Sequence, residues 1–169
     1  PERIATYIGC DLSKPALDIA QRQIDALSIS ARLLCDDMLK VAEEQPDQSI
    51  DLVLSSYAVH HLNAHNKQRL VDQATRVLKP GGQFVLIDIF REPTEDRAAY
   101  MRDYMDVLRK TWSNLSPDAQ ELVVNHATEY DYPEQTTFYQ MLCEKLGLGS
   151  GQRLAKHTWH EAWAFNRAT

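Results

Sequence analysis

The sequence predicts an α/β fold with a mostly parallel sheet, a helical insertion, and an antiparallel hairpin near the C-terminal end. Over residues 5–89, apolar runs of strand length alternate with amphipathic helical segments, which is typical of right-handed βαβ crossovers. From about residue 94 to 150 the apolar residues follow a helical period instead. The runs 153–156 and 162–166 have strand character and lie so close together that they can pair only antiparallel.

The first half of the chain alternates strands and helices in a regular order. Ser13 is the expected N-cap of its first helix, with Pro15 in the first turn. The run IDLVLSS is continuously apolar, as in a strand buried on both faces of a parallel sheet. The predicted strands are residues 5–10, 31–35, 50–56 and 83–89, and the predicted helices are residues 14–27, 38–44 and 67–78.

Three helices are expected in the insertion at about 94–150, beginning at Thr94, at Ser116 and near Pro133. The first of them carries a wide apolar stripe, which predicts packing in the core or across a homodimer. Its aromatic members can alternatively shape a site for a flat or apolar acceptor. The stripe consists of Tyr100, Met101, Tyr104, Met105, Leu108 and Trp112.

Composition bounds the class of protein. The 169 residues suit a single domain, and their 44% hydrophobic and 25% charged content is ordinary for a globular chain. A net charge of -6 without a Lys/Arg cluster argues against nucleic-acid binding. The apolar runs are too short to cross a bilayer, so no membrane partner is expected. Three irregularly spaced cysteines predict neither disulfides nor a zinc knuckle and favour a reducing, cytoplasmic location.

Asp11 stands at the carboxyl end of the first predicted strand. Ligands of open parallel sheets bind at that edge, and an acidic residue there accepts hydrogen bonds from ribose hydroxyls. The alternative role of Asp11 is to cap the helix that follows. A glycine-rich loop normally lies about 20 residues before such an acid. Because residues 1–4 alone precede this strand, we expect the central first strand and its loop to be missing from this chain.

Four segments, in order, resemble the class I S-adenosylmethionine-dependent methyltransferases. They are similar to the second strand with its ribose-binding acid, the third strand with its adenine-contacting acid, the fourth strand and its turn, and the turn entering the fifth strand. The segments read YIGCDLS (7–13), LLCDDM (33–38), SIDLVLSSYAVHHL (49–62) and RVLKPGG (76–82). The resemblance covers most of residues 5–90 and implies a Rossmann-like sheet whose helical insertion covers the substrate.

The resemblance also implies S-adenosylmethionine as the cofactor. Asp37 followed by Met38 fits the family's acid-then-apolar pattern better than Asp36, although either acid can contact adenine or cap the helix after it. The residues expected to bind the cofactor are Asp11, Leu12, Asp36, Asp37, Met38 and Ser55.

His60 and His61 follow the fourth strand of the resemblance and are the candidate catalytic residues, as proton acceptors. A purely structural role in the turn is the alternative. His61 and His65 lie four residues apart, which suits metal ligation, but the sequence places no Cys, Asp or Glu beside them to complete a ligand set. No metal is therefore predicted.

The sequence therefore favours a cytoplasmic enzyme that transfers a methyl group to a small-molecule acceptor. The alternative is a non-catalytic methyltransferase-like protein that binds a protein partner through its insertion. A nicotinamide-dependent oxidoreductase shares the strand-end acid, but the Pro80-Gly81-Gly82 turn and the terminal hairpin fit that class poorly.

Overall fold

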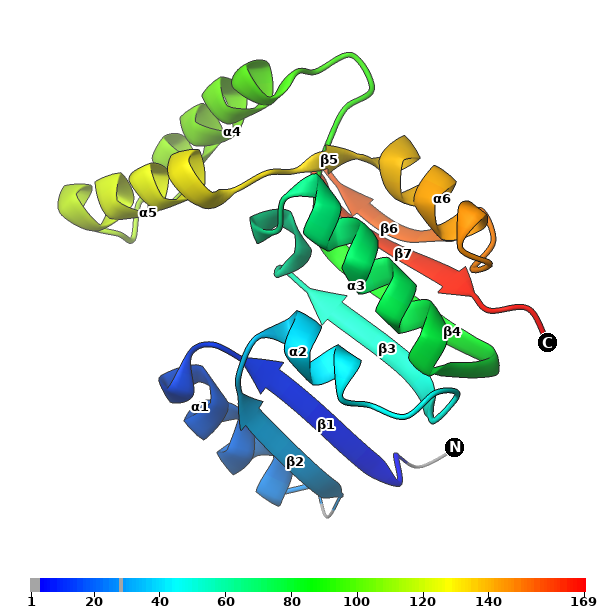
Figure 1. Cartoon of the computed structure of the whole chain (residues 1–169). Coiled ribbons are helices and arrows are strands. Elements are labelled where there is room, and N and C mark those ends of the chain that lie inside the picture. Colours follow the sequence, from blue (N-terminus) through cyan, green and yellow to red (C-terminus); the bar gives the residue numbers. More distant parts are fainter. Residues whose placement is uncertain (1–3, 28) are drawn as a thin grey trace. The chain divides into compact units, whose positions relative to one another are not determined.

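The computed structural model describes residues 4–27 and 29–169. The chain forms two compact units, Pro1–Asp47 and Gln48–Thr169, and their strands belong to separate sheets. Figure 1 labels the elements of each unit. Helices alternate with parallel strands in both units, so the predicted α/β class is confirmed.

The first unit is a two-stranded parallel sheet with two helices. Strand β1 (Thr6–Asp11) pairs with β2 (Ser30–Cys35), and Asp11 lies opposite Cys35. Helix α1 (Lys14–Asp25) begins where the sequence predicts, because the Ser13 hydroxyl accepts a hydrogen bond from the Ala16 N–H at 3.3 Å. Helix α2 (Met38–Glu43) follows β2 and buries Leu39 and Val41.

The sheet of the second unit runs in the order β3-β4-β7-β6. Strands β3 and β4 are parallel, whereas β7 pairs antiparallel with both β4 and β6, so the predicted terminal hairpin is confirmed. The bounds are Ile50–Ser56 for β3, Leu78–Arg91 for β4, Gln152–His157 for β6 and His160–Asn166 for β7.

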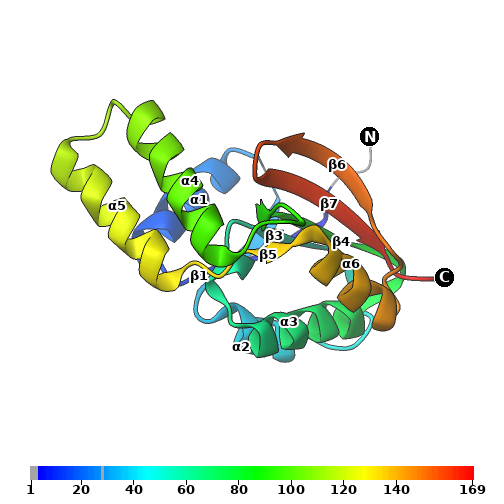
Figure 2. The ribbon, with the colours of Figure 1, turned by 90° about the horizontal axis from the view of Figure 1, so that it is seen from above.

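Helices α3 (Ala64–Val77) and α6 (Thr136–Lys145) lie on one face of this sheet (Figure 2). Helix α3 begins three residues earlier than predicted because the Asn63 side chain caps it, accepting a hydrogen bond from the Asn66 N–H at 2.9 Å. The 3-10 turn η1 (Val59–His61) connects β3 to this helix.

The insertion is built on an antiparallel pair of helices, α4 (Arg97–Thr111) and α5 (Pro117–Tyr130) (Figure 1). The predicted apolar stripe of α4 forms the core between them, although Trp112 at its end is 45% exposed. That core contains Ile89, Tyr100, Met101, Met105, Leu108, Val124 and Ala127. Among the described residues, no helix combines the length and apolarity needed to cross a membrane.

Two predicted helix starts in the insertion are wrong. Asp96, not Thr94, caps α4, and its carboxylate accepts a hydrogen bond from the Ala99 N–H at 2.7 Å. The third helix begins at Thr136 because the preceding residues form a short strand, β5 (Glu134–Gln135), paired with the end of β4. Local sequence pattern does not encode that pairing, because its partner lies about 44 residues away.

Candidate functional site

The carboxyl end of the two-stranded sheet carries the predicted cofactor-binding acids. Because Asp11 lies opposite Cys35 in the parallel register, Asp11 and Asp36 leave the sheet at the same edge. Burial raises the pKa of the Cys10 thiol, and the charges of Asp11, Asp37 and Asp36 raise it further. The three carboxylates therefore converge around the end of β1.

Each of these acids also makes a local contact. The exposed Asp11 carboxylate accepts a hydrogen bond from the Ser13 N–H at 2.7 Å. Asp37 caps α2, accepting from the N–H groups of Leu39 and Lys40 at 2.8 and 3.2 Å. The Lys40 ammonium, and then the Asp37 N–H, hold the pKa of Asp36 below its ordinary value. The capping alternative is confirmed for Asp37 and is wrong for Asp11 and Asp36, because Ser13 caps α1 and Asp37 caps α2. Nucleoside binding by these acids stays a prediction.

The chemistry of this edge fits an adenosine group. The carboxylates are acceptors for ribose hydroxyls and an adenine amino group, and Asp11 remains open to solvent. Two apolar side chains flank the acids: Leu12 is 74% exposed, and Met38 is partly buried. Asp11, Leu12, Asp37 and Met38 would hold the nucleoside of S-adenosylmethionine here.

In the second unit, the candidate residues lie where β3 ends. Ser55 is partly buried opposite Leu86 of β4. Tyr57 turns the chain out of the strand in the left-handed region, at a φ of 49° that is uncommon for a bulky residue. Its N–H donates to the Ile87 carbonyl at 2.8 Å, which holds this conformation in place.

Asp88 of β4 fixes the turn that carries the two histidines. Its side chain is buried, and it accepts hydrogen bonds from the N–H groups of Val59, His60 and Ile89 at 3.0, 3.2 and 2.8 Å. The remaining contact of this carboxylate is with His60 Nδ1, at 2.5 Å. An ionised carboxylate only accepts hydrogen bonds, so the His60 tautomer that suits this contact is the one with its proton on Nδ1. In the neutral ring, the Nε2 atom then presents a lone pair.

Asp131 brings a second carboxylate to the histidines. Its Oδ1 atom lies 3.2 Å from His61 Nδ1 and 3.7 Å from His60 Nε2. The residue is 6% exposed, and this oxygen accepts no well-formed hydrogen bond from the part of the chain that the structure describes. Asp131 raises the pKa of His61, burial opposes this effect, and the Tyr130 carbonyl supports it.

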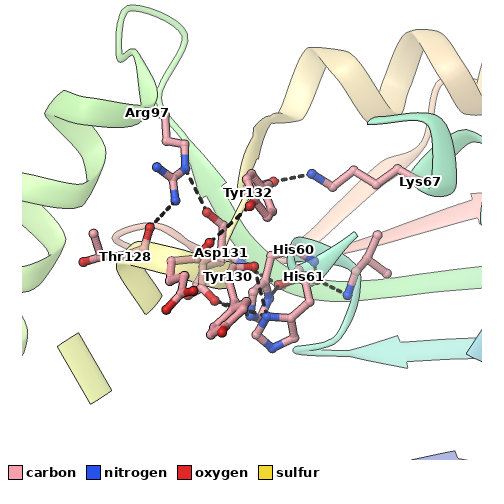
Figure 3. Close-up of polar contacts among 12 residues, drawn as sticks. His60, His61, Lys67, Arg97, Thr128, Tyr130, Asp131 and Tyr132 are labelled. Carbon is pink, nitrogen blue, oxygen red and sulfur yellow. Dashed lines mark hydrogen bonds and ion pairs between the residues drawn. The ribbon is translucent and has the colours of Figure 1, made fainter. Parts of the chain in front are cut away.

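The segment around Asp131 is held in place by bonds to its backbone (Figure 3). The Tyr132 N–H donates to the His60 carbonyl at 2.7 Å, which ties this segment directly to the histidine turn. The Arg97 guanidinium donates to the carbonyls of Asp131 and Thr128 at 2.9 and 2.6 Å. The fully buried Lys67 ammonium donates to the Tyr132 carbonyl and pairs with Glu134 at 3.4 Å.

Sequence reasoning missed both carboxylates. Asp88 had a readable signal, since it is the one acid in the apolar strand run FVLIDIF. Asp131 had none, because it lies about 70 residues from His61 and follows a helix of the insertion. The structure thus brings an acid to His60 and His61, whereas His65 lies apart on α3.

Comparisons with known proteins find similarity to methyltransferases. A family model described as a methyltransferase domain matches residues 2–82. An uncharacterized methyltransferase of Geobacillus kaustophilus is 26% identical over 133 residues, covering 74% of this chain and 61% of that protein. The ubiquinone/menaquinone biosynthesis C-methyltransferase UbiE of Hydrogenovibrio crunogenus is 29% identical over 107 residues, covering 59% of this chain and 39% of its own length.

Solved structures share the fold. An O-methyltransferase family protein from Burkholderia thailandensis superposes with a TM-score of 0.67 at 13% identity, covering 99% of this chain and 52% of that one. The chain spans less than two thirds of the curated relatives just named. Sequence similarity to methyltransferases over the first half and fold over nearly all of the chain agree with the four motifs, and together they support a class I S-adenosylmethionine-dependent methyltransferase.

Proposed function

We propose that this protein transfers a methyl group from S-adenosylmethionine to a small-molecule acceptor. The observation that carries the proposal is the convergence of Asp11, Asp36 and Asp37 at the carboxyl edge of a parallel sheet. The ubiquinone/menaquinone biosynthesis C-methyltransferase among the relatives supports an acceptor of small-molecule class.

The chemistry of the cofactor determines which roles are left to the residues of the protein. When bound, S-adenosylmethionine supplies a methyl group on a sulfonium sulfur that is already electrophilic. The residues of this chain therefore have to bind the cofactor and the methyl acceptor, orient them and exclude water. Orientation alone can lower a reaction barrier by up to roughly 7–11 kcal/mol. We assign nucleoside binding to the acids of the first unit and to Leu12 and Met38, and a lining role to Ser55.

His60 and His61 are the proposed proton acceptors for a hydroxyl or ammonium acceptor. Asp88 positions His60 by accepting its Nδ1 proton, which leaves Nε2 available. His61 is the more accessible of the two, because 40% of its side chain is exposed. Both rings lie at the end of β3, the position where a parallel sheet offers its ligand crevice.

The test is calorimetric titration of S-adenosylhomocysteine into the full-length protein and its Asp11→Asn variant. The amide of this variant retains an oxygen for the Ser13 N–H but lacks the charge that strengthens bonds from ribose hydroxyls. We expect binding to weaken by about 10- to 100-fold, since hydrogen bonds to charged groups contribute about 1.5–3 kcal/mol.

Asp25→Asn, at the exposed end of α1, is the matched control and should bind as the wild type does. Equal binding by Asp11→Asn would contradict the ribose role. A folded full-length protein that binds no S-adenosylhomocysteine would overturn the proposed function and favour partner binding through the insertion.

A further inference from the structure

We propose that His60, His61 and Asp131 form a binding site for a divalent transition-metal ion. Each residue offers one ligand atom within 4.8 Å of the other two. The nitrogens that face Asp131 Oδ1 are His60 Nε2 and His61 Nδ1. Two imidazoles and one carboxylate form a ligand set suited to zinc or iron(II). The proposal concerns binding alone and does not depend on methyl transfer.

The spacing of the ligand atoms suits a small cation. A tetrahedral zinc ion with bonds of about 2.0–2.1 Å holds its ligand atoms roughly 3.3 Å apart. Asp131 Oδ1 lies 3.2 Å from the nitrogen of His61 and 3.7 Å from that of His60. The protein supplies three ligands, so at least one coordination position stays open, as in catalytic rather than structural metal sites.

The Asp131 carboxylate gives the cluster a negative charge that favours a cation beside the two imidazole rings. With its proton on Nδ1, neutral His60 turns an Nε2 lone pair toward Asp131 Oδ1, which is itself an acceptor. The 3.7 Å between His60 Nε2 and Asp131 Oδ1 leaves room for a positive centre, which is either a proton on the ring or a metal ion bound by both atoms. Asp131 Oδ1 is buried and lacks a well-formed hydrogen bond from the described residues, so it is available as a ligand.

Asp88 provides the outer hydrogen bond that metal-binding histidines usually make. A ligating histidine commonly donates its other ring N–H to a carboxylate, which fixes the tautomer and the ring orientation. The 2.5 Å contact between His60 Nδ1 and the buried Asp88 is of this kind. The Tyr132 N–H bond to the His60 carbonyl then holds Asp131 near the two rings before any ion binds.

A metal would compete with protons for the same nitrogen atoms. Without a metal, the histidines offer the lone pairs that accept a proton in the proposed function. With a metal bound, the open coordination position would instead bind an oxygen atom of the methyl acceptor. Nucleoside binding tests Asp11 and metal binding tests this cluster, so one proposal can fail while the other stands.

The experiment is calorimetric titration of zinc into the chelator-treated, tag-free full-length protein, followed by visible absorption of the cobalt(II) form. We expect one saturable equivalent and a cobalt spectrum without thiolate charge-transfer bands. His61→Gln and Asp131→Asn should each weaken binding at least tenfold. His61 is half-exposed, so its variant is expected to fold, and circular dichroism checks both variants.

His65→Gln is the matched control, since His65 is an exposed histidine on α3 outside the cluster. It should bind zinc as the wild type does. Absence of stoichiometric binding by the wild type, unchanged binding by folded His61→Gln, or thiolate bands that assign the ion to a cysteine would each overturn the proposal. In the last two cases the ion binds elsewhere in the protein.

Discussion

The Asp88 carboxylate accepts three backbone N–H groups and contacts His60 Nδ1 from a position that is 1% exposed. A carboxylate buried this deeply is tolerated only when its lone pairs are occupied. Because these partners come from η1 and from β4 itself, the side chain joins the end of β3 to its neighbouring strand. The geometry of the histidine turn therefore depends on one charged group.

Replacing Asp88 with Asn should destabilise the protein by about 2–4 kcal/mol. Asn offers one acceptor oxygen, and its amide N–H₂ faces donors, so buried N–H groups lose their partners. Urea unfolding measures the change. Asp51→Asn is the control: its side chain is 82% exposed and pairs with Lys79 at the surface, so a loss below about 0.5 kcal/mol is expected. Similar losses in both variants would contradict the buried-network role.

Residues near each other in sequence were predictable, and residues joined by the fold were not. Asp11 and the Asp36–Asp37 pair stand at strand ends that apolar periodicity reveals, and the structure confirms those strand ends. Asp131 follows a helix whose length and loop set where the carboxylate returns to the sheet. No local pattern encodes that return, so the sequence alone does not predict the pairing of Asp131 with His61.

At the scale of elements, the hairpin of β6 and β7 depends on the glycine that precedes it. Gly151 has a φ of +80°, and a Cβ there would lie 2.4 Å from the ring of Phe165. Phe165 is fully buried and stacks on Phe84 and Trp163, so the ring has no room to retreat. The entry to β6 thus requires a residue without a side chain.

Gly151→Ala should lower the free energy of unfolding by about 2–4 kcal/mol, combining left-handed strain with overpacking. Gly147→Ala isolates the first effect, since Gly147 has a φ of +90° and open space where the Cβ would be. A loss of about 1 kcal/mol is expected for it. Chemical denaturation of both variants gives the comparison, and an equal loss would show that the Phe165 contact is unimportant.

Helix starts were predicted correctly where a proline in the first turn followed the capping serine. Ser13 and Ser116 cap α1 and α5 as predicted, each followed by a proline in the first turn. Before α4, Thr94 and Asp96 compete, and Asp96 is the cap because its carboxylate reaches the Ala99 N–H. Propensity does not separate two good caps two residues apart.

At the scale of the whole molecule, we expect His160 to make the stability of the fold depend on pH. His160 of β7 has its Nδ1 atom buried without a hydrogen bond from the described residues. Burial lowers the pKa of His160, the neighbouring His157 on β6 lowers it further, and Asp88 on β4 opposes the shift. Tyr57 and Tyr104 also contact this ring.

Since the folded pKa of His160 is below its ordinary 6.5, the unfolded chain takes up this proton first. Its contribution to stability is therefore complete above about pH 6.5 and is lost as the pH falls toward the folded pKa. His160→Gln should flatten the pH dependence of unfolding in this window by less than about 1 kcal/mol, because solvent screens a half-exposed ring. Melting temperatures between pH 5 and 7.5 test this, with His65→Gln as the control. An unchanged slope in His160→Gln would refute it.

The α/β class and the terminal hairpin were predictable because the local periodicity of apolar residues indicates both. Strands β1 and β2 form one sheet, and β3, β4, β7 and β6 form another. Whether the chain is one domain stays a prediction, as do the expected central strand with its glycine-rich loop and a homodimer formed through the insertion.

The cations around Asp131 have a consequence for how this insertion can change. Lys67, Arg91 and Arg97 donate to carbonyl groups of residues 128–133, and a carbonyl is present whatever the side chain. Substitutions along this stretch leave those bonds intact, provided that the path of the backbone is kept. The insertion can therefore diverge in sequence while the Asp131 carboxylate stays in position.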